Sequence, residues 1–347
     1  MPPSELIAPA GASPTGRRVV TGYLILWLVW LLLIGTVVGT GYTAIQYIRN
    51  NALDDARHDM DSLGVVLAEQ TARTIQSVDL VLRAVQSRTA DLGIQTPDDF
   101  RQHMAGEGTH RLLSEYLRNL PQAQMIAVVD ADGWLLSWSS EGPLPKLDLS
   151  DRNYFQYLRS HDQSDVFVSG PKIGRVSSKW IMVIVRRING PDGRFLGVVA
   201  GVIDTKYLED FYRTISPHRG QSVTLLHRDG VVIAGFPDLG DWRGTQIPSG
   251  SAWYPHVLQG GGDFITPDYL GGPPTIVTVH PLRDYPLVVN INMTRRTALA
   301  SASQEIIEVI LVRAAAVIIF TALFCVISKL FRHQENHARE LASVADA

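Results

Sequence analysis

Two long apolar runs, one near each end of the chain, constrain the fold more than any other feature of the sequence. The first run, Val19–Ile48, has no charged residue and exceeds the roughly 20 residues that a helix needs to cross a bilayer. The second run, Val309–Leu330, is interrupted by Arg313, whose long side chain we expect to reach a membrane surface. The sequence therefore predicts transmembrane helices at 19–44 and 309–329, in contact with a lipid bilayer.

Positively charged residues lie next to both apolar runs. They are Arg17 and Arg18 before the first run, and Lys329, Arg332 and Arg339 at and after the end of the second. Because cations accumulate on the cytoplasmic side of membrane proteins, we expect both termini (1–18 and 330–347) in the cytoplasm and residues 49–305 outside it. A cleaved signal peptide is the alternative for the first run, but its apolar core is too long and no small-x-small site ends it.

Charge and cysteine content exclude several classes of protein. The 347 residues carry a net charge of −3, with 19% charged residues and no basic tract, so no nucleic-acid partner is expected. The single cysteine, Cys325, lies in the second apolar run. The region between the runs is therefore expected to have neither disulfides nor a cysteine metal site, and its hydrophobic core must stabilise it.

Apolar residues after the first run recur at helical spacing. Leu53, Met60, Leu67 and Val78 belong to this series, and no proline interrupts it before Ile94. The pattern predicts one long amphipathic helix over 45–95. Such a helix needs a partner along its side, which is its own domain, a second protomer, or both.

The rest of the outer region repeats itself. A strand, an Asp-Gly turn and a second strand occur around Asp132 and again around Asp229, 97 residues apart, and each copy ends in a predicted hairpin. Two copies with their elements in the same order predict two similar α+β modules in tandem. We expect a first module at 96–212, a second module at 213–296, a linker helix at 297–308 and a helical tail at 330–347.

Four segments carry a resemblance to a known family. They are Asp151–Phe155 ("DRNYF"), Ser169–Ile188, Gly193–Tyr212 and Leu225–Pro237. Together they resemble the double-Cache (PAS-like) extracytoplasmic sensor of bacterial transmembrane receptors such as histidine kinases and diguanylate cyclases, over roughly Asn50–Arg296. The resemblance implies an α+β fold with a long N-terminal helix and two tandem PAS-like modules between two transmembrane helices.

The same resemblance implies location and partners. A receptor of this kind resides in the bacterial inner membrane, forms a homodimer, and binds a small molecule in the periplasm. It signals to a cytoplasmic output domain or to a signalling partner, and any kinase or cyclase output is expected beyond this chain.

The resemblance also implies a ligand pocket in the first module, on the side away from the membrane. In the amino-acid-binding branch an arginine and an aromatic pair hold the ligand carboxylate, and an aspartate at a strand end holds its amine. Arg152, Tyr154 and Phe155 match the first group, and Asp204 matches the second. The branch has a tyrosine where this chain has Leu147, so an amino acid, a related acid, an amine and another small metabolite all remain open as ligands.

The residues by themselves allow plainer interpretations. Arg152 suits a carboxylate because a guanidinium donates two parallel hydrogen bonds, but it can equally pair with a neighbouring aspartate while Tyr154 and Phe155 pack in the core. Asp204 can cap a helix or a turn. Trp180 can form a pocket wall or belong to the core.

Known catalytic motifs are not found. The segment Gly260–Phe264 ("GGGDF") lacks an acidic residue of the cyclase signature and is predicted as a glycine-rich hairpin loop; His333 and His337 have no further metal ligand beside them. We therefore expect a sensor with no catalytic residues, no metal and no cofactor. The alternatives are a membrane-anchored periplasmic enzyme and an interaction scaffold without a ligand.

Overall fold

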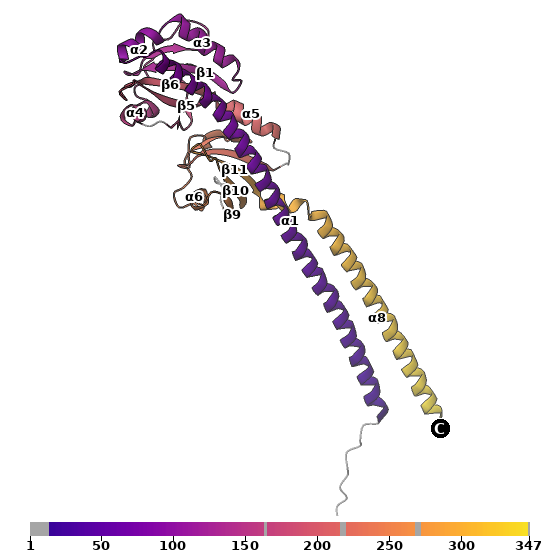
Figure 1. The fold of residues 1–347 in the computed structure, drawn as a ribbon. Coiled ribbons are helices and arrows are strands. Elements are labelled where there is room, and N and C mark those ends of the chain that lie inside the picture. Colours follow the sequence, from indigo (N-terminus) through magenta and orange to yellow (C-terminus); the bar gives the residue numbers. More distant parts are fainter. Residues whose placement is uncertain (1–13, 163–164, 216–219, 268–271, 346–347) are drawn as a thin grey trace, which may run out of the picture. The chain divides into compact units, whose positions relative to one another are not determined.

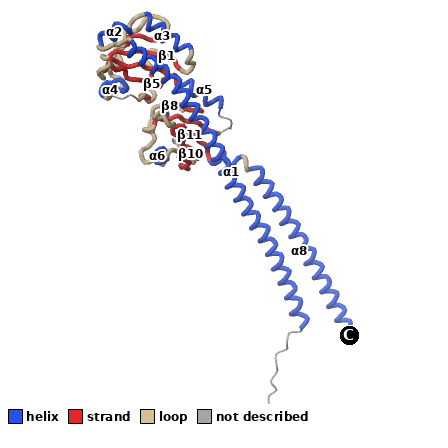
Figure 2. Tube along the Cα trace, viewed as in Figure 1, coloured by secondary structure: helices blue, strands red, loops and turns tan. Residues whose placement is uncertain are grey.

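The computed structural model describes residues 14–162, 165–215, 220–267 and 272–345. The chain divides into two compact units, of which Asp55–Ala298 is the larger, and the other joins residues up to Asp54 with those from Leu299 onward. Figure 2 shows helices at both ends of the chain and the strands between them. The side chains of Arg17, Arg18, His337 and Arg339 lie outside those that the structure describes.

Two long helices, α1 (Pro14–Asp91) and α8 (Ser303–Ala345), contain stretches that are long and apolar enough to cross a membrane (Figure 1). Their apolar side chains face outward: Leu28 is 65% exposed and Ile318 is 68% exposed. An outward-facing apolar surface of this kind is suited to lipid rather than to water. The predicted long N-terminal helix is confirmed, and it is continuous with the first apolar run.

The first module is an antiparallel sheet with the strand order β2-β1-β6-β5-β3, in which β4 also pairs with β5. Its strands are β1 (Ala123–Asp130), β2 (Leu135–Trp138), β3 (Phe167–Val168), β4 (Lys172–Ile173), β5 (Trp180–Asn189) and β6 (Phe195–Asp204). Its helices are α2 (Pro97–Met104), α3 (Glu107–Arg118), α4 (Asn153–Ser160) and α5 (Thr205–Ile215). The predicted β5–β6 hairpin is present, with Val185 opposite Ala200.

The second module repeats this plan with the strand order β8-β7-β11-β10-β9. Its strands are β7 (Gln221–His227), β8 (Val232–Phe236), β9 (Gly262–Thr266), β10 (Thr275–Pro281) and β11 (Leu287–Thr294). The short helices are η1 (Gly240–Trp242) and α6 (Trp253–Leu258), and α7 (Arg295–Ala300) follows the last strand. Both modules are thus antiparallel sheets, as the sequence repeat predicts.

Each sheet of the larger unit packs between two layers. In the first module one face lies against α1, because Gly201 of β6 approaches Val78 so closely that a Cβ at this position would lie 2.4 Å from its Cγ1. The opposite face carries α4, whose Tyr154, Phe155 and Leu158 join the core of that side. This second face is the one that holds the candidate site.

One local prediction was wrong. The segment Gly260–Phe264 is not a hairpin loop throughout, because Gly262–Phe264 belong to β9, the edge strand of the second sheet. Phe264 lies opposite Val277 of β10 and stacks on His256 of α6. These contacts make a strand out of a segment whose composition alone favours a turn.

Candidate ligand-binding site

A cavity of about 100 Å³ lies on the α4 side of the first sheet. Its walls are mostly apolar, with polar side chains at a few points. The residues that line it are Gln124, Met125, Ala127, Leu135, Ser140, Leu147, Leu149, Arg152, Tyr154, Lys172, Gly174, Arg175, Val176, Ser177, Ile181, Val183, Ala200 and Val202. An apolar hollow with a few polar groups is the usual composition of a small-molecule site.

Small side chains at the sheet centre create this space. Ala127 of β1 lies opposite Ala200 of β6, and both line the cavity. Larger β-branched residues are the common occupants of such buried strand positions. Two alanines side by side therefore leave a depression in the sheet surface beneath α4.

The segment before α4 is held at the rim of the cavity by backbone hydrogen bonds. The amide of Leu135 donates to the carbonyl of Leu147 at 3.0 Å, and the amide of Leu149 donates to the carbonyl of Gly133 at 2.8 Å. Gly133 has φ of +100° in the Asp-Gly turn, a conformation that favours glycine. This anchoring brings the N-terminal end of α4, with Arg152 as its N-cap residue, to the cavity.

Arg152 and Tyr154 are the two predicted residues that meet in the cavity. Within the described ranges, neither the Arg152 guanidinium nor the Tyr154 hydroxyl has a hydrogen-bond or ion-pair partner in the protein. Tyr154 is only 6% exposed, and burial raises the pKa of its hydroxyl to about 12. The phenol is therefore neutral and able to donate a hydrogen bond at physiological pH.

Two further cationic residues line the cavity, and neither was predicted from the sequence as a site residue. Lys172 belongs to β4, and Arg175 belongs to the loop after it. Arg175 donates to the Asp151 carboxylate, which lowers the pKa of that group, and to the Asp148 carbonyl. The signal that was available is the recurrence of Lys and Arg in "PKIGR", within one of the segments that resemble the family.

The charged residues that line the cavity are all positive. Arg152, Lys172 and Arg175 contribute three positive charges, while no aspartate or glutamate is among the lining residues. The nearby carboxylates of Asp148 and Asp151 are exposed and already accept hydrogen bonds, from the Ser150 amide and from Arg175 respectively. A cavity of this kind favours an anionic group.

Phe155 is in the core behind the cavity rather than in its wall. Its side chain is 1% exposed and makes an edge-to-face contact with Phe195, with ring centroids 5.7 Å apart. Phe155 thus lies on the same helix as Tyr154 but is not a lining residue. This packing fixes α4 on the sheet, and a contact of Phe155 with a ligand stays a prediction.

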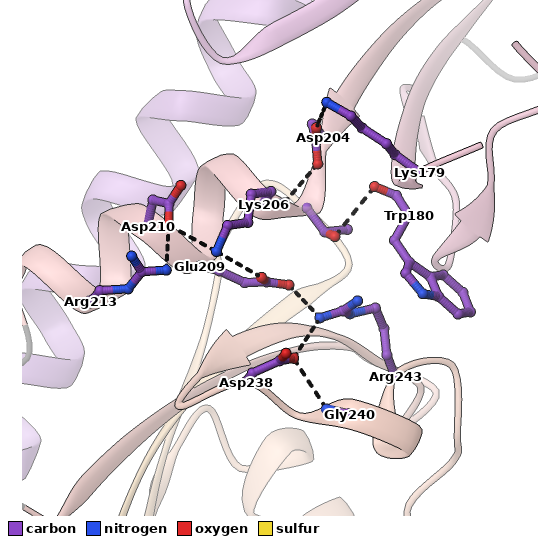
Figure 3. A network of polar contacts seen from close by, with 11 residues as sticks. Lys179, Trp180, Asp204, Lys206, Glu209, Asp210, Arg213, Asp238, Gly240 and Arg243 are labelled. Carbon is purple, nitrogen blue, oxygen red and sulfur yellow. Dashed lines mark hydrogen bonds and ion pairs between the residues drawn. The ribbon is translucent and has the colours of Figure 1, made fainter. Parts of the chain in front are cut away.

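Trp180 and Asp204 line a different recess, of about 290 Å³, which shares no residue with the first cavity. Asp204 accepts hydrogen bonds from the amide of Lys206 at 2.9 Å and from the ammonium of Lys179 at 3.3 Å (Figure 3). The first contact caps the start of α5, which is one of the plainer interpretations considered above. The structure therefore does not bring Asp204 into the cavity with Arg152.

The recess marks the junction of the two modules (Figure 3). Arg243, next to η1 in the second module, donates to Glu209 of α5 at 2.6 Å and lies over the Trp180 ring at 5.7 Å from its centroid. Burial raises the pKa of the Glu209 carboxyl, against the opposing effect of Arg243. A partly buried ion pair thus joins the end of the first module to the second.

A metal site has no basis in the described residues. Among them, no three or more His, Cys, Asp or Glu side chains are grouped so that they could hold a metal ion. Cys325 of α8 is a free thiol.

A family model agrees with this architecture. The double-Cache model, a Cache domain, matches residues 46–302. The chain belongs to the double-Cache family. The matched relatives are sensor domains of histidine kinases and chemoreceptors, so this region is a Cache sensor domain with an apolar helix on either side of it that is compatible with a membrane span.

Solved structures of other Cache domains are similar to this chain. The extracellular domain assigned to a histidine kinase, rpHK1S-Z16, is 31% identical with a TM-score of 0.62, and the match covers 72% of this chain and 98% of that one. The periplasmic sensory domain of the Campylobacter jejuni chemoreceptor Tlp1 is 10% identical with a TM-score of 0.58, covering 72% and 98%.

A third structure carries a ligand. The ligand-binding domain of the Pseudomonas fluorescens chemoreceptor CtaA, in complex with L-alanine, is 15% identical with a TM-score of 0.51, covering 71% of this chain and 100% of that one. At such low identity this likeness establishes the fold alone. No curated protein sequence matches the chain.

Proposed function

We propose that this protein is a membrane-bound sensor in which the cavity of the first module binds a small extracytoplasmic molecule through an anionic group. One observation carries the proposal: Arg152 and Tyr154 line an apolar cavity that has no carboxylate in its lining, and neither the guanidinium nor the hydroxyl has a partner in the described part of the chain. Leaving such groups without a partner is costly unless water or a ligand satisfies them. A carboxylate that accepts from both satisfies them together.

The route from the cavity to the membrane follows the chain. Gly174 and Ser177 line the cavity, and three residues after Ser177 the chain reaches Trp180, which lies against Arg243 of the second module. The second module leads through β11 and α7 into α8. Binding that reorders the Gly174–Ser177 loop would bias the contact between the modules and with it the helix that enters the membrane.

Within this proposal the remaining features follow those of membrane receptors. Both termini are cytoplasmic, the Cache region is periplasmic in a bacterial inner membrane, and the receptor is a homodimer without catalytic activity. The signal passes to a histidine kinase or cyclase output, or to a separate partner. A membrane-anchored hydrolase and a ligand-free scaffold are the competing functions.

A binding screen on the full-length protein in lipid nanodiscs tests the proposal. Carboxylates, phosphates, amines and amino acids are added, and the melting temperature and calorimetric Kd are measured. We expect one anionic class to bind, and Arg152→Ala to weaken that binding at least tenfold because a charge-assisted pair contributes about 1.5–3 kcal/mol.

Arg159→Ala is the matched control, because Arg159 is exposed near the other end of α4 and does not line the cavity. Binding that survives Arg152→Ala unchanged would show that the site is elsewhere. Turnover of an added ester or amide would favour the hydrolase, and the absence of any ligand would favour the scaffold.

A further inference from the structure

We infer that the ligand is a carboxylate with an apolar body and no ammonium group, rather than an α-amino acid. This inference rests on the proposed function of the cavity and names the class of molecule that it accepts.

The anionic end of the ligand has a defined place. Arg152, Tyr154 and Lys172 line the cavity, and within the described part of the chain the Arg152 guanidinium and the Tyr154 hydroxyl have no protein partner. A guanidinium and a phenol together match the two oxygens of one carboxylate. A single carboxylate therefore uses the polar groups that are available.

An ammonium group has no corresponding place. Asp204, the residue expected to hold an amine, does not line the cavity and is bonded to Lys179 and to the Lys206 amide. The rim carboxylates of Asp148 and Asp151 are likewise engaged and lie outside the lining. The three cations of the lining repel an ammonium, although Asp151 at the rim pairs with Arg175, and burying an ammonium without a partner costs several kcal/mol.

The rest of the wall is apolar. Leu135, Leu147, Ile181, Val183 and Val202 line the cavity around the two alanines. A volume of about 100 Å³ is that of a small site, since an apolar cavity of about 150 Å³ holds a benzene-sized molecule. A carboxylate with a small apolar body suits this size and buries its apolar part against these side chains.

Matched ligand pairs test the inference on the full-length protein in nanodiscs, with Kd measured by calorimetry. Each pair differs only in the α-ammonium: butanoate and 2-aminobutanoate, 4-methylpentanoate and leucine, phenylacetate and phenylglycine. We expect at least one carboxylate to bind at least tenfold more tightly than its amino-acid partner. Tyr154→Phe should weaken that carboxylate about tenfold without lowering the melting temperature of the free protein.

A substitution of similar shape can supply the acid that the cavity wall lacks. Gln124 lines the cavity and has no side-chain partner in the described part of the chain, so Gln124→Glu adds a carboxylate to the wall with little change of shape. The affinity ratio of the carboxylate to its amino-acid partner should fall about tenfold in this variant. An unchanged ratio would mean that the missing acid does not set the preference.

The failures of the two proposals can be told apart. Amino acids that bind as well as or better than the carboxylates, with the same dependence on Arg152, overturn the inference and leave the proposed site intact. An Arg152-dependent phosphate, or no binding by the whole carboxylate series, also overturns it. Carboxylate binding that is unaffected by Arg152→Ala overturns the proposed site itself.

Discussion

In the first module Ala127 lies opposite Ala200 on neighbouring strands, and in the second module the same positions hold Thr224 and Asn290. Thr224 follows Ala127 by the 97 residues that separate the two Asp-Gly turns. The alanines leave a cavity beneath α4, whereas Asn290 accepts a hydrogen bond at 3.1 Å from the indole of Trp253, which is 1% exposed at the start of α6. One sheet position thus supports a hollow in one module and a filled core in the other.

A second pair of equivalent positions fastens the sheets to α1. Arg186 of β5 makes a buried ion pair with Asp79 of α1, with N–O distances down to 2.5 Å. Its counterpart His280 of β10 lies under Gly64 of α1, where a Cβ would be 2.1 Å from the imidazole ring, and 3.8 Å from Asp61. The first module is therefore attached by an arginine–aspartate ion pair, and the second by packing against a histidine, which is a titratable group.

These differences suggest how binding and stability are divided. The first module has a space where a ligand can contribute packing, and a buried ion pair attaches it to the helix. The second module is packed without a ligand at the equivalent position. Substitutions that exchange these properties test the difference between the modules.

The largest effect is expected from Trp253→Ala. Removing a fully buried tryptophan leaves a cavity in the core of the second module and should lower the free energy of unfolding by about 3–5 kcal/mol. Trp253→Phe keeps most of the volume but loses the hydrogen bond to Asn290, and should cost less, with about 1 kcal/mol from that bond. Urea unfolding of the detergent-solubilised protein, followed by circular dichroism, measures both; equal losses would show that Trp253 does not fill the core.

An intermediate effect is expected from Ala200→Leu, which fills the cavity of the first module. The binding of its best anionic ligand should weaken about 30-fold, or about 2 kcal/mol, while the free energy of unfolding changes little because the new side chain enters existing space. Val199→Leu, on the opposite face against α1, is the matched control and should cost about 1–3 kcal/mol by overpacking. Calorimetry and urea unfolding separate the two, and full binding by Ala200→Leu would place the ligand elsewhere.

The smallest effect concerns pH. Burial lowers the pKa of His280 below its ordinary value of 6.5, although Asp61 opposes this shift. The unfolded chain therefore binds a proton before the folded protein does, so this residue's contribution to stability is fully present above pH 6.5. It is lost as the pH falls towards the folded-state pKa, by about 1.4 kcal/mol for each unit of lowering.

The measurement compares the wild-type protein with His280→Gln. The difference between their unfolding free energies should be constant from pH 8 to 7 and should decrease for the wild type as the pH falls to 5. A difference that stays constant down to pH 5 would show that folding does not shift the pKa of His280.

Local patterns in the sequence were enough to predict the long helix, the two tandem modules and the apolar helices. Each depends on residues close together in the chain: the spacing from Leu53 onward, the turns at Asp132 and Asp229, and the uncharged stretch after Val19. These properties are repeated along the chain, so periodicity and turn chemistry reveal them. Arg152 and Tyr154 were also predicted as ligand-binding residues from one short segment, and both line the cavity.

The cavity itself was decided by tertiary structure. Whether Ala127 and Ala200 meet depends on the register of two strands more than 60 residues apart in the chain. Phe155 packs inward against Phe195, which is distant in sequence. Asp204 caps α5 through the Lys206 amide, which is a local contact, and also pairs with Lys179 of the neighbouring strand region. The sequence by itself determined which elements form and which side chains are charged, since these are local properties. Only the tertiary structure decided which side chains face a common space, because that depends on how the elements pack.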